Sequence, residues 1–199
     1  MVSAFLQGFS VGGGLILAIG GQNAFLLTQG LKRQHHLLVA SICFVCDVSL
    51  IFAGVMGLGT LIVSSPVLLE IARWGGVLFL GWMGLQALLR VFKEEHLETN
   101  EQVTIDKKAI ITTTLAVTLL NPHVYLDTVV MIGSIGAQQG DQRVNFALGA
   151  ATASMIWFYS LGLGAAGMAP LVKSSKIWKV IDTLVCLVMW SVALSLVMR

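Results

Sequence analysis

Six long apolar stretches divide the 199-residue sequence, and they decide what kind of fold the chain can adopt. Each is long enough to supply the ~20 consecutive apolar residues of a membrane-spanning helix. The residues are 56% hydrophobic and 11% charged, whereas soluble domains are about a quarter charged. The sequence therefore predicts an all-α, polytopic membrane protein whose six transmembrane helices cross a lipid bilayer at about residues 4–27, 37–63, 67–92, 109–136, 144–169 and 178–198.

The longest polar segment, residues 93–108, separates two sets of three predicted helices. Because three is odd, half-repeats at about 1–92 and 109–199 would have opposite orientations, as in the inverted-topology repeats of secondary transporters. We expect a single transmembrane transporter domain over residues 1–199. The sequence has no Gly-rich loop followed by Lys-Ser or Lys-Thr, so it does not predict ATP-driven pumping by this chain. We expect no cofactor, no metal site and no nucleic-acid partner.

The positions of the basic residues predict the orientation of the chain. Cytoplasmic connections of membrane proteins carry an excess of Lys and Arg. Nine of the twelve basic residues lie in or beside the first, third and fifth connections, which we therefore place in the cytoplasm with both termini outside. The nine residues are Lys32, Arg33, Arg90, Lys93, Lys107, Lys108, Lys173, Lys176 and Lys179.

The fourth apolar stretch contains helix-breaking and polar residues at its midpoint, where Asn121-Pro122-His123 is followed by Asp127. A backbone opened by proline at membrane depth is tolerated only where it is buried in protein or lines a watery cavity. Transporters build substrate sites from such broken helices. The simpler alternative is a proline kink that serves only packing.

The first stretch has an interruption at the corresponding place, about 100 residues earlier. Adjacent Gly20 and Gly21 each weaken a helix by about 1 kcal/mol relative to alanine, and the polar Gln22 and Asn23 follow them. The sequence therefore predicts helix breaks at Gly20, Gly21 and Pro122, and we expect the two breaks to face one substrate site.

Two carboxylates, Asp47 and Asp127, lie deep inside predicted spans, and no Lys or Arg lies at comparable depth. Such acids must be protonated, hydrogen-bonded or neutralised by a bound cation. A cationic substrate or a proton would serve. The alternative is that nearby hydroxyl groups satisfy them, namely those of Ser49, Thr118 and Thr128.

Several motifs together resemble the LysE-type amino acid exporters, and the resemblance covers essentially the whole chain. Within that family the chain is most similar to the arginine exporter branch, because the homoserine and threonine exporters usually have Asn-Pro-Lys at the second break. The family commonly has Pro-x-Gly-Pro-Gln-Asn in the first span, and here both prolines are missing. The motifs are Gly20-Gly21-Gln22-Asn23-Ala24-Phe25, Gln29-Gly30-Leu31-Lys32-Arg33-Gln34-His35-His36, Asp47, Asn121-Pro122-His123-Val124-Tyr125-Leu126-Asp127-Thr128, Ser154 and Trp157-Phe158.

The resemblance implies a secondary active exporter, not an enzyme, that moves L-arginine across the bacterial inner membrane. Lysine and canavanine are further candidate substrates, and protons are the expected exchange partner. We expect Asp47 and Asp127 to face one cavity, where one of them binds the guanidinium and both, with His123, carry protons. The remaining predicted substrate-binding residues are Gln22, Asn23, Asn121, Tyr125 and Trp157.

Other functions, and a possible homodimer, remain open at this stage. Export of neutral amino acids or metal cations would use the acids only for protons, and a lone His123 is weak evidence for a metal. A membrane thiol or electron carrier would use Cys43 and Cys46, which have redox-motif spacing. The chain could also be a structural subunit. The small residues Gly8 and Gly12 could mediate a homodimer or, as we favour, packing within the chain.

Overall fold

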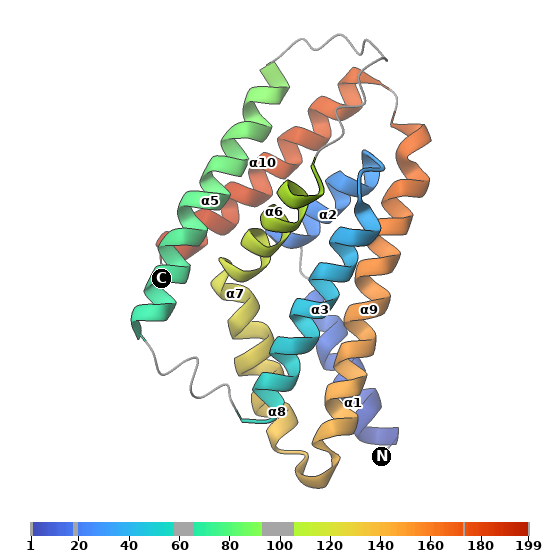
Figure 1. Cartoon of the computed structure of the whole chain (residues 1–199), viewed down its shortest axis with the longest axis vertical. Helices are drawn as coiled ribbons and strands as arrows, with labels where there is room; N and C mark the ends of the chain where they lie inside the picture. Colours follow the sequence, from blue (N-terminus) through green and yellow to red (C-terminus); the bar gives the residue numbers. More distant parts are fainter. Residues whose placement is uncertain (1, 18–19, 58–65, 93–105, 173, 199) are drawn as a thin grey trace.

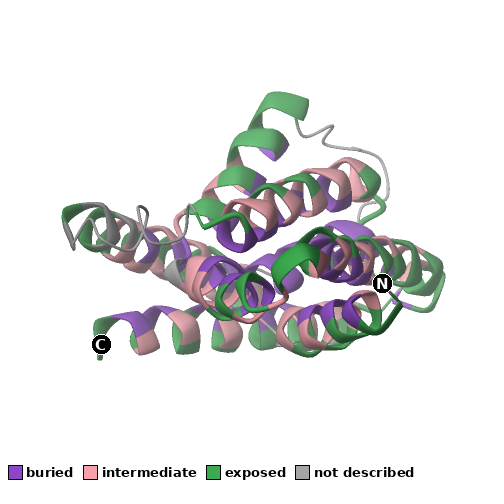
Figure 2. Cartoon of the chain, turned by 90° about the horizontal axis from the view of Figure 1, so that it is seen from below, coloured by how far each residue is buried: buried purple, intermediate pink, exposed green. Residues whose placement is uncertain are grey.

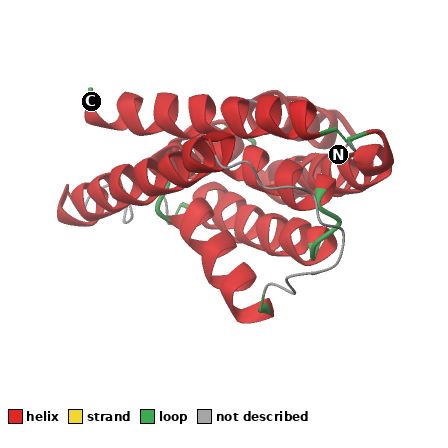
Figure 3. Ribbon diagram, turned by 90° about the horizontal axis from the view of Figure 1, so that it is seen from above, coloured by secondary structure: helices red, strands yellow, loops and turns green. Residues whose placement is uncertain are grey.

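The computed structural model describes residues 2–17, 20–57, 66–92, 106–172 and 174–198, and these residues form helices joined by short turns, without a strand (Figures 1 and 3). This confirms the all-α fold. The helices are α1 (Val2–Ile16), α2 (Gly21–Leu31), α3 (His36–Val55), α5 (Pro66–Phe92), α6 (Lys107–Leu119), α7 (Pro122–Val124), the π-helix η1 (Tyr125–Ile132), α8 (Gly133–Ala137), the 3-10 turn η2 (Gly140–Gln142), α9 (Arg143–Met168), the 3-10 turn η3 (Ala169–Leu171) and α10 (Ser175–Val197).

Four helices among the described residues are long and apolar enough to cross a membrane, at His36–Val55, Arg73–Phe92, Gly140–Leu171 and Ile177–Val197. The pair α1 and α2, whose axes differ by 79°, could form a fifth span. The predicted fourth span, 109–136, is not one helix: it is divided into α6, α7, η1 and α8. The predicted end of the second span, beyond residue 57, lies outside the described residues.

The division of the fourth segment follows from its Asn-Pro sequence. Helix α6 ends at Leu119, and α7 begins at Pro122, because proline has no N–H to donate and disfavours helical backbone in the residue before it. Asn121 then acts as a helix N-cap, since its Oδ1 accepts a hydrogen bond from the His123 backbone N–H at 3.1 Å. Pro122 occupies the first helical position, which favours proline.

Small residues let α1 pack closely along α9, and α5 runs beside α10 (Figure 1). A Cβ added to Gly8 or Gly12 would overlap backbone atoms of Phe146 or Ala150, and one on Gly149 would overlap the Phe5 carbonyl. The Gly8 and Gly12 face is therefore buried within the chain. This agrees with intramolecular packing and leaves that face unavailable to a dimer.

Helix α2 lies at the centre of the bundle although it is short and polar. Ten of its eleven residues are buried, and only Leu27 is exposed. Many large exposed side chains of α5 and α10, such as Leu78 and Leu187, are apolar and suit a lipid environment. Figure 2 shows buried residues toward the middle of the bundle and exposed ones around it. Polar side chains of α2 can thus face internal cavities.

Candidate functional site

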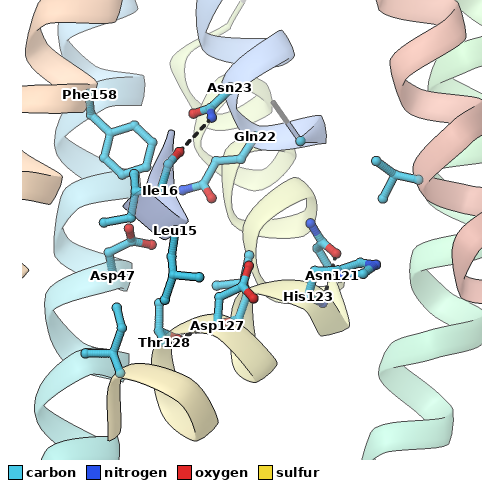
Figure 4. A pocket seen from close by; sticks show the side chains of 14 residues that line it. Leu15, Ile16, Gln22, Asn23, Asp47, Asn121, His123, Asp127, Thr128 and Phe158 are labelled. Atoms are coloured by element: carbon cyan, nitrogen blue, oxygen red, sulfur yellow. Dashed lines mark hydrogen bonds between the residues drawn. The ribbon is translucent and has the colours of Figure 1, made fainter. Parts of the chain in front are cut away.

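A cavity of about 220 Å³ lies where the two helix breaks meet α3, and Figure 4 shows the side chains around it. Its walls come from the end of α1, the start of α2, α3, the second break with η1, α9 and α10. The lining residues are Leu15, Ile16, Gly20, Gln22, Asn23, Asp47, Asn121, His123, Val124, Asp127, Thr128, Ile132, Phe158 and Val192.

Most of the residues predicted from the sequence line this one cavity. They are Gly20, Gln22, Asn23, Asp47, Asn121, His123 and Asp127. Three others, Gly21, Tyr125 and Trp157, are not among the lining residues. Gly21 begins α2 and Pro122 begins α7, so both stand at the two helix breaks.

Asp47 is 3% exposed and reaches the cavity from the middle of α3. The hydroxyl of Ser154, on α9, donates a hydrogen bond to its Oδ2 at 3.2 Å. The expected donor Ser49 is not this partner, because its hydroxyl donates to the Val45 carbonyl one turn back at 2.8 Å. Ser154 was not predicted as a site residue, although it is one of the motif residues that resemble the family and lies three and four residues before Trp157 and Phe158.

Asp127 faces the same cavity from η1 and is close enough to Asp47 for the two carboxylates to interact electrostatically. The Gln22 side chain also interacts with Asp47. Neither Lys nor Arg occurs among the residues that line the cavity in the described part of the chain. The cavity therefore has acidic and amide groups suited to a cation with several N–H donors.

Asn23 connects the first break to α9. Its Nδ2 donates to the carbonyl of Ile16, the last residue of α1, at 3.1 Å, and its Oδ1 accepts from the Trp157 indole N–H at 3.2 Å. The first bond satisfies one of the carbonyls that a helix end leaves without a partner. Trp157 thus contacts the site through Asn23.

The second break is held by two further contacts. The Tyr125 hydroxyl donates to the carbonyl of Leu119, the last residue of α6, at 2.8 Å. The His123 Nε2 lies 3.2 Å from the Ser195 hydroxyl on α10. Tyr125 therefore bridges the gap in the broken segment, and His123 links the cavity wall to α10.

The described residues contain no group of three or more His, Cys, Asp and Glu side chains that could hold a metal ion. Cys43 is buried and Cys46 half-buried on α3, and both are free thiols. The cavity lining includes neither cysteine.

The sequence model of the LysE type translocators matches residues 14–199. The chain belongs to this family. The arginine exporter protein ArgO of Serratia proteamaculans (strain 568) is 46% identical over 98% of this chain and 97% of its own length. ArgO of Enterobacter sp. (strain 638) is 47% identical over 98% of this chain and 94% of its own. A putative amino-acid transporter, YggA of Aeromonas salmonicida, is 44% identical over 98% and 96%.

This LysE family member is therefore a transporter and not an enzyme, and it is a multi-pass protein of the bacterial inner membrane. No solved structure matches the chain. As a translocator, the protein has an acidic internal cavity bounded by two interrupted helices.

Proposed function

We propose that this protein exports L-arginine across the inner membrane, with lysine and canavanine as further candidate substrates. The observation that carries the proposal is the cavity that contains Asp47 and Asp127 and whose described lining includes neither Lys nor Arg. A guanidinium supplies the missing positive charge and can donate paired hydrogen bonds to a carboxylate. Relatives at 46% and 47% identity named arginine exporters support this substrate.

The two breaks suggest how the rest of the amino acid is bound. The N-terminal ends of α2, at Gly20, and of α7, after Asn121, lie beside the cavity, and helix N-termini favour negative charge. In our proposal they bind the substrate carboxylate, while Gln22, Asn23 and Asn121 orient its α-amino and carboxylate groups. The Gln22 side chain interacts with Asp47, but its buried side-chain nitrogen has no hydrogen-bond partner among the described residues, so this nitrogen can donate to a substrate.

In this scheme Tyr125 and Trp157 do not bind the substrate directly, which differs from the substrate-binding role expected from the sequence. Their polar atoms bond to the Leu119 carbonyl and to Asn23. We therefore assign them the role of positioning the two breaks.

Proton exchange is the proposed energy source. Moving one positive charge out of a negative-inside cell costs about 2.3 kcal/mol per 100 mV. Exchange of arginine for one proton is electroneutral and needs only the pH gradient. Asp47, Asp127 and His123 are the titratable groups in the cavity wall, and an acid that binds arginine and a proton alternately would couple the two movements.

We further propose that six spans form a 3+3 inverted repeat, with α1–α2 and α6–α8 as broken first helices. Pairing of corresponding helices supports it: α3 packs on α9, and α5 packs on α10. A two-fold relation between the halves exchanges α1 with α6 and α9 with α3. The contact of α1 with α9 should therefore have a counterpart between α6 and α3, and both contacts are present. Any homodimer would have to use helix faces other than the one that carries Gly8 and Gly12.

The decisive experiment is counterflow of labelled arginine into liposomes that contain purified wild type, Asp47→Asn or Asp127→Asn protein. A hydrogen bond to a charged group contributes about 1.5–3 kcal/mol, so we expect at least about tenfold slower uptake in one or both variants. Asp141→Asn is the matched control, because Asp141 is exposed in η2, outside the cavity. Normal uptake in both cavity variants would refute the assignment of the acids.

Substrate competition separates the alternatives. Excess lysine or canavanine should reduce labelled arginine uptake, whereas inhibition by threonine or divalent metals alone would favour the neutral amino acid or metal exporter. The thiol carrier reading requires Cys43 and Cys46, so normal transport by a variant with serine at both positions would exclude it. A wild type protein that is folded but takes up none of these substrates would favour a structural subunit.

Proton coupling has its own test. In vesicles with the membrane potential clamped, an imposed pH gradient should drive arginine against its concentration gradient. Transport indifferent to that gradient would show that another ion or none is exchanged.

A further inference from the structure

A second cavity, of about 300 Å³, lies between α2, α5, α6 and α10, the helices around the upper centre of Figure 1. Its wall includes Lys32, just after α2, Arg90, in the last turn of α5, and Ala109, near the start of α6. These positions are helix ends at the first and third connections, which the positive-inside rule places in the cytoplasm. The cavity thus begins at the level of the inner-leaflet headgroups.

The two cations at this end are held by neighbouring side chains. Arg90 Nε donates to Asp182 Oδ1 at 3.0 Å, and this bond does not use the two terminal amino groups of the guanidinium. The Lys32 Nζ lies 6.0 Å from the centre of the Trp178 ring. Two positive charges come from separate helices, and the ion pair of Arg90 among the described residues uses a single acid, Asp182, so an anionic group is favoured at the cavity.

A buried hydrogen-bond acceptor in the same wall, the side-chain oxygen of Gln29, indicates which groups the ligand must carry. Gln29 lies one turn before Lys32 on α2, is 6% exposed, and lines the cavity. Its Oε1 is buried and accepts no hydrogen bond from the described residues. Since unpaired buried polar atoms are unfavourable, a fitting ligand has a hydrogen-bond donor close to its anionic oxygens.

Apart from the polar residues Thr28, Gln86 and Thr113, the rest of the lining is apolar, and it reaches the outer surface of α5. Trp82, which lines it, is 59% exposed and lies on α5 with other exposed apolar residues such as Leu78 and Leu89. That surface contacts lipid in a membrane. The interior part of the lining is formed by Phe25, Phe79, Met83, Val185 and Met189.

We propose that this cavity binds one anionic phospholipid of the inner leaflet whose headgroup bears hydroxyl groups, such as phosphatidylglycerol. Lys32 and Arg90 bind the phosphate, a headgroup hydroxyl donates to Gln29 Oε1, and an acyl chain lies along the apolar wall beside Trp82. Basic pockets between membrane helices on the cytoplasmic side suit such headgroups. A free amino acid would match the polar groups but would leave the apolar part of the lining, including Phe25, Phe79 and Met83, without a ligand group against it.

Thermal unfolding and native mass spectrometry of the purified full-length protein in detergent test this proposal. We expect phosphatidylglycerol, but not phosphatidylethanolamine, to raise the unfolding temperature and to give a one-to-one adduct. Lys32→Ala should bind phosphatidylglycerol about fivefold more weakly, the loss expected for one basic residue near the headgroups. Gln29→Leu should weaken it as well, and Lys32→Arg should restore binding.

Arg33→Ala is the matched control, because it removes the same charge from the adjacent residue, whose Nε bonds instead to the Ala166 carbonyl at 3.0 Å. It should leave phosphatidylglycerol binding unchanged. If Lys32→Ala and Arg33→Ala lost phosphatidylglycerol binding equally, the lipid would be attracted by the general positive charge of this end of the protein. That result would overturn the proposed site. If glycerol phosphate raised the unfolding temperature equally, the ligand would be a soluble anion. If arginine did so, the cavity would be a substrate site. Either result would overturn the lipid assignment.

Discussion

Asn23 is the residue on which the geometry of the first break depends most directly. Its carboxamide donates to the last carbonyl of α1 and accepts from Trp157 on α9. Aspartate at this position, once ionised, would lose the donor, and serine would be too short to replace both groups. The side chain therefore fixes the break between α1 and α2 relative to α9 while it faces the cavity.

Trp157→Phe tests this positioning role. The change keeps an aromatic ring but removes the indole N–H that donates to Asn23. One net hydrogen bond contributes about 1 kcal/mol, so we expect a comparable fall in the free energy of unfolding and transport about fivefold slower. Trp74→Phe, on the exposed face of α5, should change neither quantity in unfolding and counterflow assays. If both variants behave alike, Trp157 does not act through Asn23.

The two cavity acids were predictable from the sequence, but the hydrogen-bond donor of Asp47 was not. Asp47 stands out because a charge in a span is costly. Its donor, however, is Ser154, 107 residues away. The nearby Ser49 bonds to its own helix four residues back, as serine commonly does inside helices. Position along one helix cannot reveal which helix will pack against it.

At the scale of elements, α3 and the broken segment approach each other through backbone atoms. A Cβ on Gly54 would lie 2.8 Å from the Val129 carbonyl oxygen and 2.9 Å from the Val129 Cα. Asp47 is on α3 and Asp127 on η1. The close contact at Gly54 therefore sets the separation of the helices that carry the two acids.

Gly54→Ala should force these two elements apart. Overpacking of this kind costs about 1–3 kcal/mol, and we expect lower stability together with slower arginine counterflow. Gly14→Ala is the control: an added Cβ there has no neighbour within 4 Å, and alanine favours helix by up to about 1 kcal/mol. A Gly54→Ala protein that is as stable and active as wild type would show that the spacing of α3 and η1 can relax.

Most helix ends lie within a few residues of the predicted spans, because long apolar runs and charged connections mark them. The interruptions also lie where Gly20-Gly21 and Asn121-Pro122 occur. The π-helical geometry of η1 was not predicted, since its eight residues have ordinary apolar composition and no periodicity separates π from α turns over such a length.

At the scale of the whole molecule, the number of spans determines on which side the chain begins. If α1 and α2 together cross the membrane, six spans place both termini on one side. If α1 and α2 instead enter and leave the membrane on the same side, the N-terminus lies on the same side as the first connection, which we place in the cytoplasm. The two topologies therefore differ in the location of Ser3.

Single cysteines introduced at Ser3, Asp141 and Lys107, with the three native cysteines replaced by alanine, distinguish these topologies in intact cells. We expect an impermeant maleimide to label Ser3→Cys and Asp141→Cys from outside and Lys107→Cys only after permeabilisation. Each single-cysteine protein, which lacks the three native cysteines, must first be shown to transport arginine. Protection of Ser3→Cys with labelling of Asp141→Cys would mean that the first pair is re-entrant.

The π-helix η1 also bears on how the length of this protein can change during evolution. In a regular α-helix such as α9, deletion of one residue rotates everything after it by about 100° and would turn its buried face toward lipid. A π turn already contains an extra residue per turn, so it can lose one by becoming α-helical while the register of α8 and α9 is kept. Deletion of a single residue should accordingly be tolerated in η1 more readily than in the long helices.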